Sequence, residues 1–185
     1  MTIDWITKPI SDEDPAGPDL WETDDPVFNE YYFDAAGRLP EADDYAKIGL
    51  AMGDGDKLPD IIFNPKSITL EQETSQIDGL LKRSRDLRLL TMRAQWSILA
   101  GDIEETAISV TAMAELLEEM SVNVHPVIDG PPRDRLEAIN DLSAVGAMIL
   151  PLRYLDIGGT GTSLRRVMVA RGKMTPHDGE DDLSI

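Results

Sequence analysis

Few side chains in this sequence are of the types that carry out catalysis. The chain of 185 residues contains no cysteine and only two histidines, His125 and His177. The lack of cysteine excludes thiol nucleophiles, disulfides and cysteine-bound zinc. His125 precedes a proline, which disfavours helical geometry, and the sequence offers it no acid–base partner. We interpret His125 as a structural or surface residue of a loop, and His177 as part of the C-terminal tail.

Two further patterns could bind phosphate or metal, and both are incomplete. The segment IGGTGTS, residues 157–163, lacks the lysine of a phosphate-binding P-loop and follows no evident strand, so it predicts a flexible connector. The acidic pairs Asp43–Asp44 and Glu118–Glu119 lack the ligand spacing of a calcium-binding EF-hand loop. The histidines lack the spacing of a metal-binding pair. The sequence therefore predicts no catalytic residue, no cofactor site, no metal site and no enzymatic activity.

The charge of the chain is strongly negative and unevenly distributed. The net charge is −18, with 16 acids and 4 bases in residues 1–60 against 8 acids and 7 bases in residues 131–185. Such a charge repels phosphate backbones and anionic lipids, so we expect neither a nucleic-acid partner nor a membrane partner. The acidity provides solubility or, alternatively, an acidic arm that docks on a basic partner. Without a membrane-length apolar run or a signal peptide, we expect a cytoplasmic protein with no membrane insertion.

The hydrophobic periodicity is that of an all-α protein. Asp25 as a cap, Pro26 in the first turn and Gly37 at the end indicate a first helix within residues 21–38. Residues 84–102 are apolar almost all round, which places that helix at the centre of a bundle. The other helices are expected over residues 69–84, 103–123, 133–150 (ending before Pro151) and 163–172.

Polar residues mark the expected helix starts. Thr69 with Gln72, and Asp102 with Glu105, have the spacing of capping pairs. Ser84 can cap the central helix, which puts Asp86 in its first turn, favourably placed against the helix dipole. Apolar and small residues recur at three- and four-residue steps in the helix that follows, namely Ile103, Ala107, Val110, Ala114 and Leu117. Gly146, next to Ala147 and near Ala144, would let another helix approach closely.

Three segments have no helical period. The segment PISDEDPAGPDL, residues 9–20, has three prolines, and we expect it to cross the helices as an extended strap with Ile10 and Leu20 as apolar anchors. An exposed docking surface is the alternative. Residues 38–66 indicate a long loop with one helical turn near residues 45–51. The fold expected is an irregular helical bundle of residues 1–175 with this proline-containing N-terminal strap, followed by an acidic flexible tail at 176–185.

Several short motifs occur in an informative order. The strap supplies Pro9, Ile10, Ser11, Pro15, Gly17, Asp19 and Leu20, followed by Trp21, Asp24 and Phe28. Further on come Leu80–Leu81, then Arg85, Asp86, Leu87 and Arg88, then His125–Pro126, Arg135–Leu142 and Leu150–Leu152. In this order and spacing, over about residues 9–155, the chain resembles the N-terminal domain of the ImpA/TssA proteins of bacterial type VI secretion systems. It differs in having Arg85 where the family usually has lysine, and Ala16 where it often has cysteine.

The resemblance implies a non-enzymatic adaptor that helps to assemble baseplate, tube and sheath through protein–protein contacts, without a cofactor. Its partners would be other type VI secretion subunits, and self-association would use ring-forming domains that family members carry beyond the length of this chain. The motif residues Pro9 to Leu20, with Asp86, Leu87 and Arg88, are the candidate contact residues. Alternatively, Asp86 favours the helix start and Arg88 bridges to an acid on a neighbouring helix. The other functions left open are a generic helical interaction domain outside secretion, and an enzyme with a site in residues 38–66.

Overall fold

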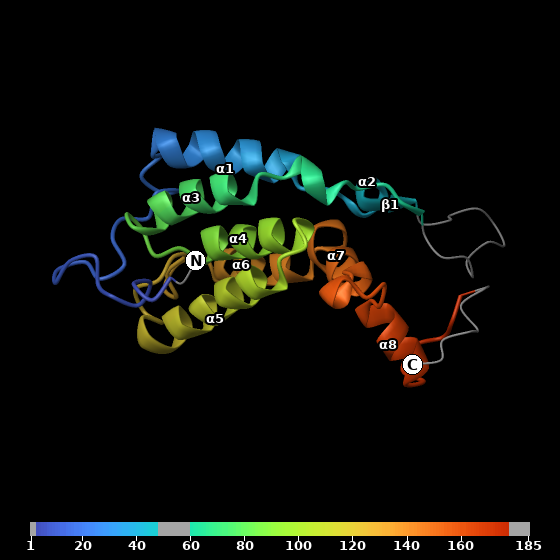
Figure 1. Cartoon of the computed structure of the whole chain (residues 1–185). Coiled ribbons are helices and arrows are strands. Elements are labelled where there is room, and N and C mark those ends of the chain that lie inside the picture. The colour runs from blue at the N-terminus through green and yellow to red at the C-terminus, as the bar shows by residue number, and fades with distance from the viewer. Residues whose placement is uncertain (1–2, 48–59, 178–185) are drawn as a thin grey trace.

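Helix α4 (Leu87–Leu99) lies at the centre of a helical bundle in the computed structural model, which describes residues 3–47 and 60–177. Helices α3 (Leu70–Leu81), α5 (Ile103–Glu119) and α6 (Pro132–Asn140) pack around it (Figure 1). All of its residues except Arg88 are buried, as the apolar sequence predicted. Within the described residues the only strands are the antiparallel pair β1 (Ala46–Lys47) and β2 (Asp60–Ile61), so the prediction of an all-α fold is confirmed.

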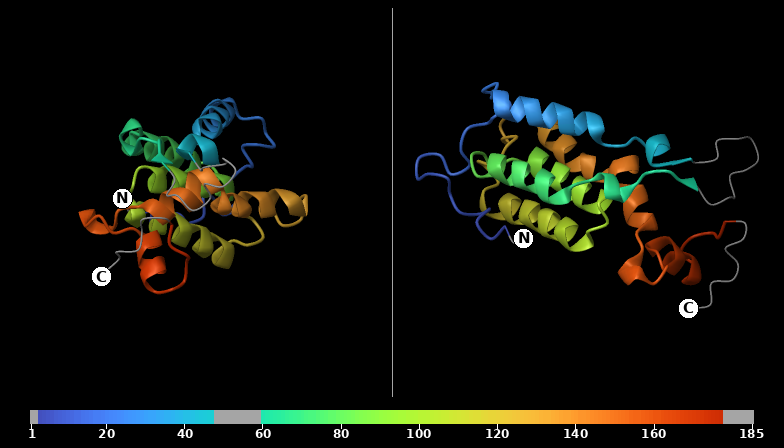
Figure 2. Two further views of the ribbon diagram at one scale, coloured as in Figure 1. Left: turned by 90° about the vertical axis from the view of Figure 1, so that its right-hand side faces the viewer. Right: turned by 45° about the horizontal axis from the view of Figure 1, so that its top comes forward.

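Helix α1 (Pro26–Arg38) lies alongside α3 on one side of the bundle (Figures 1 and 2). The Oδ1 atom of Asp25 accepts hydrogen bonds from the N–H groups of Val27 and Phe28, so the predicted cap is confirmed. The helix runs one residue past Gly37. It buries Phe28, Tyr31 and Ala35 against the core.

The start of the central helix differs from the expectation. Asp86, not Ser84, is the N-cap, and its Oδ1 accepts a hydrogen bond from the N–H of Arg88 at 2.8 Å. The reason is tertiary, because Arg85 is held on both sides: its N–H donates to Ala16 O and its carbonyl accepts from the N–H of His125. This pairing keeps residues 84–86 out of the helix.

Of the two predicted capping pairs, one is confirmed and the other is not. Asp102 caps α5 through the N–H of Glu105, as predicted. Thr69 occupies the N-cap position of α3, but its side chain makes no capping hydrogen bond.

The single helix expected over residues 133–150 is interrupted. Helix α6 gives way to a 3-10 turn (Asp141–Ser143), a π-helical turn (Val145–Ile149) and helix α7 (Leu150–Tyr154). Gly146 lies in the π-helical turn just after the break, where a Cβ would overlap the carbonyl oxygen of Pro40, just before α2 (Ala42–Tyr45). The close approach expected at Gly146 is therefore present. Pro151 lies inside α7 rather than after the helix, in the first turn, where its missing N–H is not needed.

The C-terminal elements lie at the end of the bundle opposite the strap (Figure 2). Ser163 caps α8 (Leu164–Ala170), and Gly172 follows its end with a φ of 66°, close to the expectation. Between α7 and α8, the glycine-rich segment forms a 3-10 turn (Ile157–Gly159), and Asp156 pairs with Ser163 as an isolated bridge.

The segment expected to be a long loop contains short elements of secondary structure in its described part. Its helical turn is α2, slightly earlier than expected, and β1 and β2 follow with Ala46 opposite Ile61. A short 3-10 turn (Pro65–Ser67) leads into α3. Residues 48–59, and residues 178–185 of the expected tail, lie outside the described residues. No helix among the described residues is long and apolar enough to cross a membrane.

Candidate protein-contact site

The N-terminal strap crosses one end of the bundle and is anchored by apolar side chains (Figure 1). Leu20 is 2% exposed, as expected of an anchor, whereas Ile10 is only half-buried. Ile3, Ile6 and Ala16 are also buried, and sequence reasoning missed them. The signal of the two isoleucines was weak, because two apolar residues three positions apart in a short segment do not amount to a helical stripe.

Glycine is required at position 17. Its φ is 71°, in the left-handed region, and a Cβ would overlap the carbonyl oxygen of Arg83. The strap can therefore lie directly on the backbone that joins α3 to α4. Next to this contact, the N–H of Arg85 donates to Ala16 O at 2.7 Å.

The side chain of Arg85 binds carbonyl groups of the segment that precedes the strap. Its Nη2 donates to Lys8 O at 2.8 Å and to Trp5 O at 3.3 Å, and its guanidinium lies over the Trp5 ring. Nη1 donates to Leu81 O. Burial lowers the pKa of Arg85 from its usual value. The arginine in this motif thus holds the first residues of the chain against the end of α3.

An ion network joins the strap to the first turn of α4. The Nη2 atom of Arg88 lies 2.7 Å from Asp19 Oδ1 and 2.6 Å from Asp86 Oδ2. Burial raises the pKa of Asp86, and the Arg88 guanidinium opposes that effect. Burial alone would lower the pKa of Arg88, but the two carboxylates outweigh it and raise it. The expectation that Arg88 bridges to an acid on a neighbouring helix is wrong, because its partners are in the strap and at its own N-cap.

His125 completes the same junction. The residue is 7% exposed, and its Nε2 donates to the carbonyl of Gly17 at 2.7 Å. Its Nδ1 lies 3.5 Å from Asp19 Oδ2, and its own carbonyl accepts from the N–H of Leu87. These contacts give His125 a structural position between the strap and α4, in line with our interpretation of the sequence.

The candidate contact residues divide into two groups. The structure brings Gly17, Asp19, Leu20, Asp86, Leu87 and Arg88 together in the strap junction, where each is buried or nearly so. Pro9 and Ser11 are exposed at the outer end of the strap, and Ile10 and Pro15 are half-buried. The first group holds the fold together. Only the second group presents surface to a partner.

An aromatic cluster continues the junction toward the surface. Trp21 and Phe33, with ring centroids 5.5 Å apart, are 41% and 58% exposed. Beneath them, Phe28 is buried and stacks on Tyr32, and Arg88 lies over the rings of Trp21 and Phe28. Exposed aromatic rings are common in protein interfaces, so this pair adds to the surface available for contacts.

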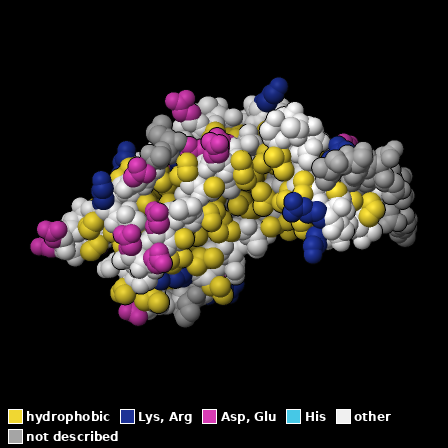
Figure 3. All heavy atoms as spheres, turned by 60° about the horizontal axis from the view of Figure 1, so that its bottom comes forward, with side chains coloured by type: hydrophobic (Ala, Val, Ile, Leu, Met, Phe, Trp, Pro, Cys, Tyr) yellow, Lys and Arg dark blue, Asp and Glu magenta, His cyan; other side chains and the backbone are white. Residues whose placement is uncertain are grey.

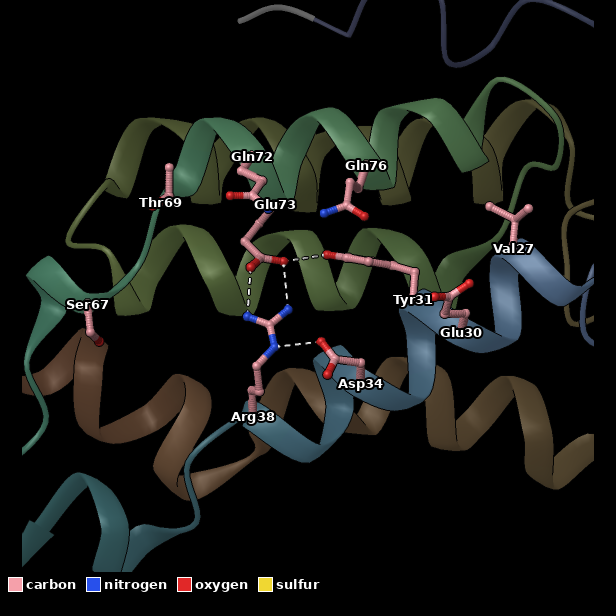
Figure 4. Close-up of a pocket in the computed structure, with 10 residues that line it drawn as sticks. All are labelled: Val27, Glu30, Tyr31, Asp34, Arg38, Ser67, Thr69, Gln72, Glu73 and Gln76. Atoms are coloured by element: carbon pink, nitrogen blue, oxygen red, sulfur yellow. Dashed lines mark hydrogen bonds and ion pairs between the residues drawn. The ribbon is translucent and has the colours of Figure 1, made fainter.

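A polar groove of about 630 Å³ lies between α1 and α3 (Figure 4). Within it, Arg38 forms two hydrogen bonds to Glu73, at 2.7 and 3.1 Å, and Tyr31 donates to the same carboxylate at 2.8 Å. Asp34 pairs with the Nε of Arg38 at 2.9 Å. Burial raises the pKa of Tyr31, and the hydrogen bond to Glu73 raises it further. These side chains are hydrogen-bonded to one another, and the bonds of Arg38 and Tyr31 to Glu73 connect α1 to α3.

Helix α5 exposes most of the apolar stripe that its sequence pattern contains, whereas Leu117, the last residue of that stripe, is half-buried against the core. Ile103 is 46% exposed and Val110 is 38% exposed, and Ala107 and Ala114 are exposed between and beyond them. The buried face of α5 carries Thr106, Ser109, Ala112, Met113 and Leu116. The face of the molecule that includes α5 shows hydrophobic side chains gathered in a broad band (Figure 3).

Of the polar residues on the buried face of α5, Ser109 has its partner in α4, whereas the hydroxyl of Thr106 donates to Asp102 O of its own helix start. The fully buried Arg93 donates to Ser109 Oγ at 2.8 Å and pairs with Glu105 and with Asp78 of α3. Sequence periodicity predicted the helix. It could not show that the face of α5 with Thr106 and Ser109 is the buried one, because that depends on the buried Arg93 of α4. Among the described residues, no group of three or more histidine, aspartate or glutamate side chains is placed to hold a metal ion.

Comparison with known proteins identifies the family. Residues 7–144 match the model of the family described as ImpA, N-terminal, type VI secretion system. The match extends from the strap through α6 and the 3-10 turn that follows it, and includes the whole of the strap junction. Comparisons with curated proteins and with solved structures gave no match. Because the family model covers well over half of the chain, this protein belongs to the ImpA N-terminal family of type VI secretion system proteins.

Proposed function

We propose that this protein is a non-enzymatic adaptor that helps to assemble the baseplate, tube and sheath of a type VI secretion system. Its partners would be other subunits of that system, bound without a cofactor. The observation that carries the proposal is the family match over residues 7–144, which makes the chain a type VI secretion component.

The use of charged side chains supports a role in contacts rather than catalysis. Arg38, Arg88 and Arg93 all pair with carboxylates of the same chain, and these pairs join helices or fix the strap. Large apolar side chains are meanwhile exposed on α1 and α5, including Phe33 and Ile103. Surfaces of this kind bury area when another protein binds.

The charge of the chain favours a particular type of partner surface. With a net charge of −18, the protein is attracted to basic surfaces and repelled by acidic ones. The outer end of the strap adds Asp12, Glu13 and Asp14, all of them exposed. This distribution supports docking through the outer end of the strap, where Pro9 and Ser11 are exposed and were predicted as contacts from the motif.

Binding to individual subunits tests the proposal. The chain would be immobilised and offered purified baseplate, tube and sheath subunits of the same secretion system, one at a time. We expect saturable capture of at least one subunit, weakened by salt. Two variants are compared, and each adds one positive charge at an exposed position. Ser11→Arg places the charge in the strap, and Ser67→Arg, the matched control, places it in the 3-10 turn before α3. Failure of every subunit to bind the folded chain would contradict an adaptor role.

A further inference from the structure

The exposed face of α5 carries two parallel stripes of different chemistry. The first is the apolar stripe of Ile103, Ala107, Val110 and Ala114, which recur at the spacing of one helix face. The second consists of Glu104, Glu115 and Glu118, exposed residues that share the adjacent edge of the helix. No lysine or arginine occurs in α5. An apolar surface with an acidic border is therefore built into this element.

A hollow lies on the acidic side of this surface. Its volume is about 250 Å³, between α5 and the start of the strap. Apolar and small side chains form much of its lining, and acids complete it: Ile3, Asp4, Ala107, Ile108, Thr111, Ala112 and Glu115. The hollow can accept an apolar side chain from a partner, and Asp4 and Glu115 can pair with cations beside it.

We propose that the α5 face is a docking site for an amphipathic helix of a partner protein, with lysine or arginine along its edge. Shape indicates a helix, because an apolar stripe with the small residues Ala107 and Ala114 leaves gaps into which the side chains of a second helix can pack. The charge of α5 indicates that the edge of the partner helix is basic, because three glutamates border the apolar stripe and α5 itself contains no lysine or arginine. The inference extends the proposed function, on which the identification of this partner as a secretion subunit rests.

A second copy of the chain does not fit this surface. Two α5 helices packed face to face and antiparallel would bring Glu104, Glu115 and Glu118 of each copy to the same side of the contact, and in any packing each molecule carries a net charge of −18. Like charges at an interface oppose association. Electrostatic complementarity therefore favours a basic partner over self-association.

The test uses a synthetic helical peptide of about 20 residues, enough to span a helix of this length, with leucine and alanine on one face and lysine along its edges. The full chain, labelled with nitrogen-15, would be titrated with the peptide and followed by two-dimensional NMR. We expect saturable shifts centred on Ala107, Val110 and Ala114. A peptide with glutamate in place of lysine should give none.

Matched variants separate this site from general attraction to an acidic protein. Ile103→Gln with Val110→Gln should weaken peptide binding about tenfold or more, equivalent to roughly 1.4 kcal/mol. Val27→Gln with Phe33→Gln removes two exposed apolar side chains from α1 and should leave it unchanged. Glu115→Gln with Glu118→Gln should weaken binding and reduce its salt dependence, whereas Glu22→Gln with Glu71→Gln, also at exposed positions, should do so much less.

Several results would overturn the inference. These are a lack of saturable shifts, shifts centred away from α5, equal weakening by the α1 and α5 variants, or a dimer in sedimentation that the α5 variants abolish. Subunit capture keeps the two proposals apart. If the α5 variants capture secretion subunits as well as the original chain does, the adaptor role stands and the α5 inference fails. If no subunit is captured while the peptide still binds α5, the adaptor role fails and the α5 face remains a helix-binding site.

Discussion

Asp19 in the strap and Arg88 in α4 form an ion pair with 2.7 Å between Oδ1 and Nη2, although 69 positions separate them in the sequence. The same guanidinium pairs with Asp86, the fully buried cap of α4. One side chain therefore attaches the strap and neutralises the charge at the start of the central helix. Its loss would affect both.

Replacement of Arg88 should destabilise the protein strongly. In Arg88→Ala the carboxylate of Asp86 stays buried without its cation, which we expect to cost about 3–5 kcal/mol of unfolding free energy. Arg83→Ala is the matched control. Arg83 also pairs with an acid at a helix N-cap, Asp25 of α1, but the Arg83 side chain is 44% exposed. That change should cost less than about 1 kcal/mol. Urea unfolding measures both, and equal losses would contradict the role assigned to Arg88.

The apolar anchors of the strap should differ in their contributions. Leu20→Ala should lower the unfolding free energy by about 2–4 kcal/mol, because Leu20 is 2% exposed and the change leaves a cavity. Ile10→Ala should cost less than half as much, because Ile10 is only half-buried. Thermal or urea denaturation distinguishes the two. Similar small effects would mean that the strap is not part of the core.

Two substitutions of glycine by alanine should change the free energy of unfolding in opposite directions. Gly146→Ala places a methyl group against the backbone of Pro40 and Glu41, and should destabilise the protein by about 1–3 kcal/mol. Gly79→Ala, inside α3, meets no atom within 4 Å. It should stabilise the protein by roughly 0.5–1 kcal/mol through helix propensity. Melting temperatures of the two variants test this, and a stable Gly146→Ala would contradict the tight contact with the segment before α2.

Stability should fall in alkali through Tyr31. Its folded pKa is raised above the unfolded value of about 10, so the neutral phenol is favoured in the fold. This contribution is complete below about pH 10 and is lost as the pH rises above that value. Urea unfolding between about pH 9 and pH 11 should show a smaller loss for Tyr31→Phe than for the original chain. Tyr32 and Tyr45, whose pKa values burial also raises, act equally in both proteins and cancel in the comparison.

Local patterns in the sequence predicted most of the helices. The apolar circumference of residues 84–102 correctly indicated the central helix, and Asp25, Asp102 and Ser163 correctly indicated helix starts. These signals work because capping and burial of a helix face depend on neighbours a few positions away. The same reasoning explains why the close approach at Gly146 could be expected from small residues alone.

Features set by distant contacts were not predictable in this way. The start of α4 moved to Leu87 because Ala16 and His125 hydrogen-bond to Arg85, and no local signal in the sequence contains that information. The helix expected over residues 133–150 breaks at residues 141–144, just before Gly146 meets the backbone that precedes α2. The exposed face of α5 depends on Arg93, whose burial becomes evident only when Asp78 and Glu105 are placed beside it.

The candidate site was predicted in part. The motif selected residues that do meet at one junction, but the sequence could not separate the buried ones, such as Asp86, from the exposed ones, such as Ser11. The sequence also did not predict that the aromatic side chains of Trp21 and Phe33 are exposed. Helical spacing alone does not indicate which aromatic side chains remain outside the core.

The attachment of the strap has a consequence for the order of folding. Helices α3, α4 and α5 follow one another through short turns, whereas the contact of Arg85 with Lys8, just before the strap, and that of His125 with Gly17 span 77 and 108 positions. Contacts between distant positions carry a larger loop-closure entropy and form late. We expect Leu20→Ala to accelerate unfolding with little effect on the folding rate, which stopped-flow kinetics would measure. The time for which the protein stays folded then depends on how long its first twenty residues remain in place.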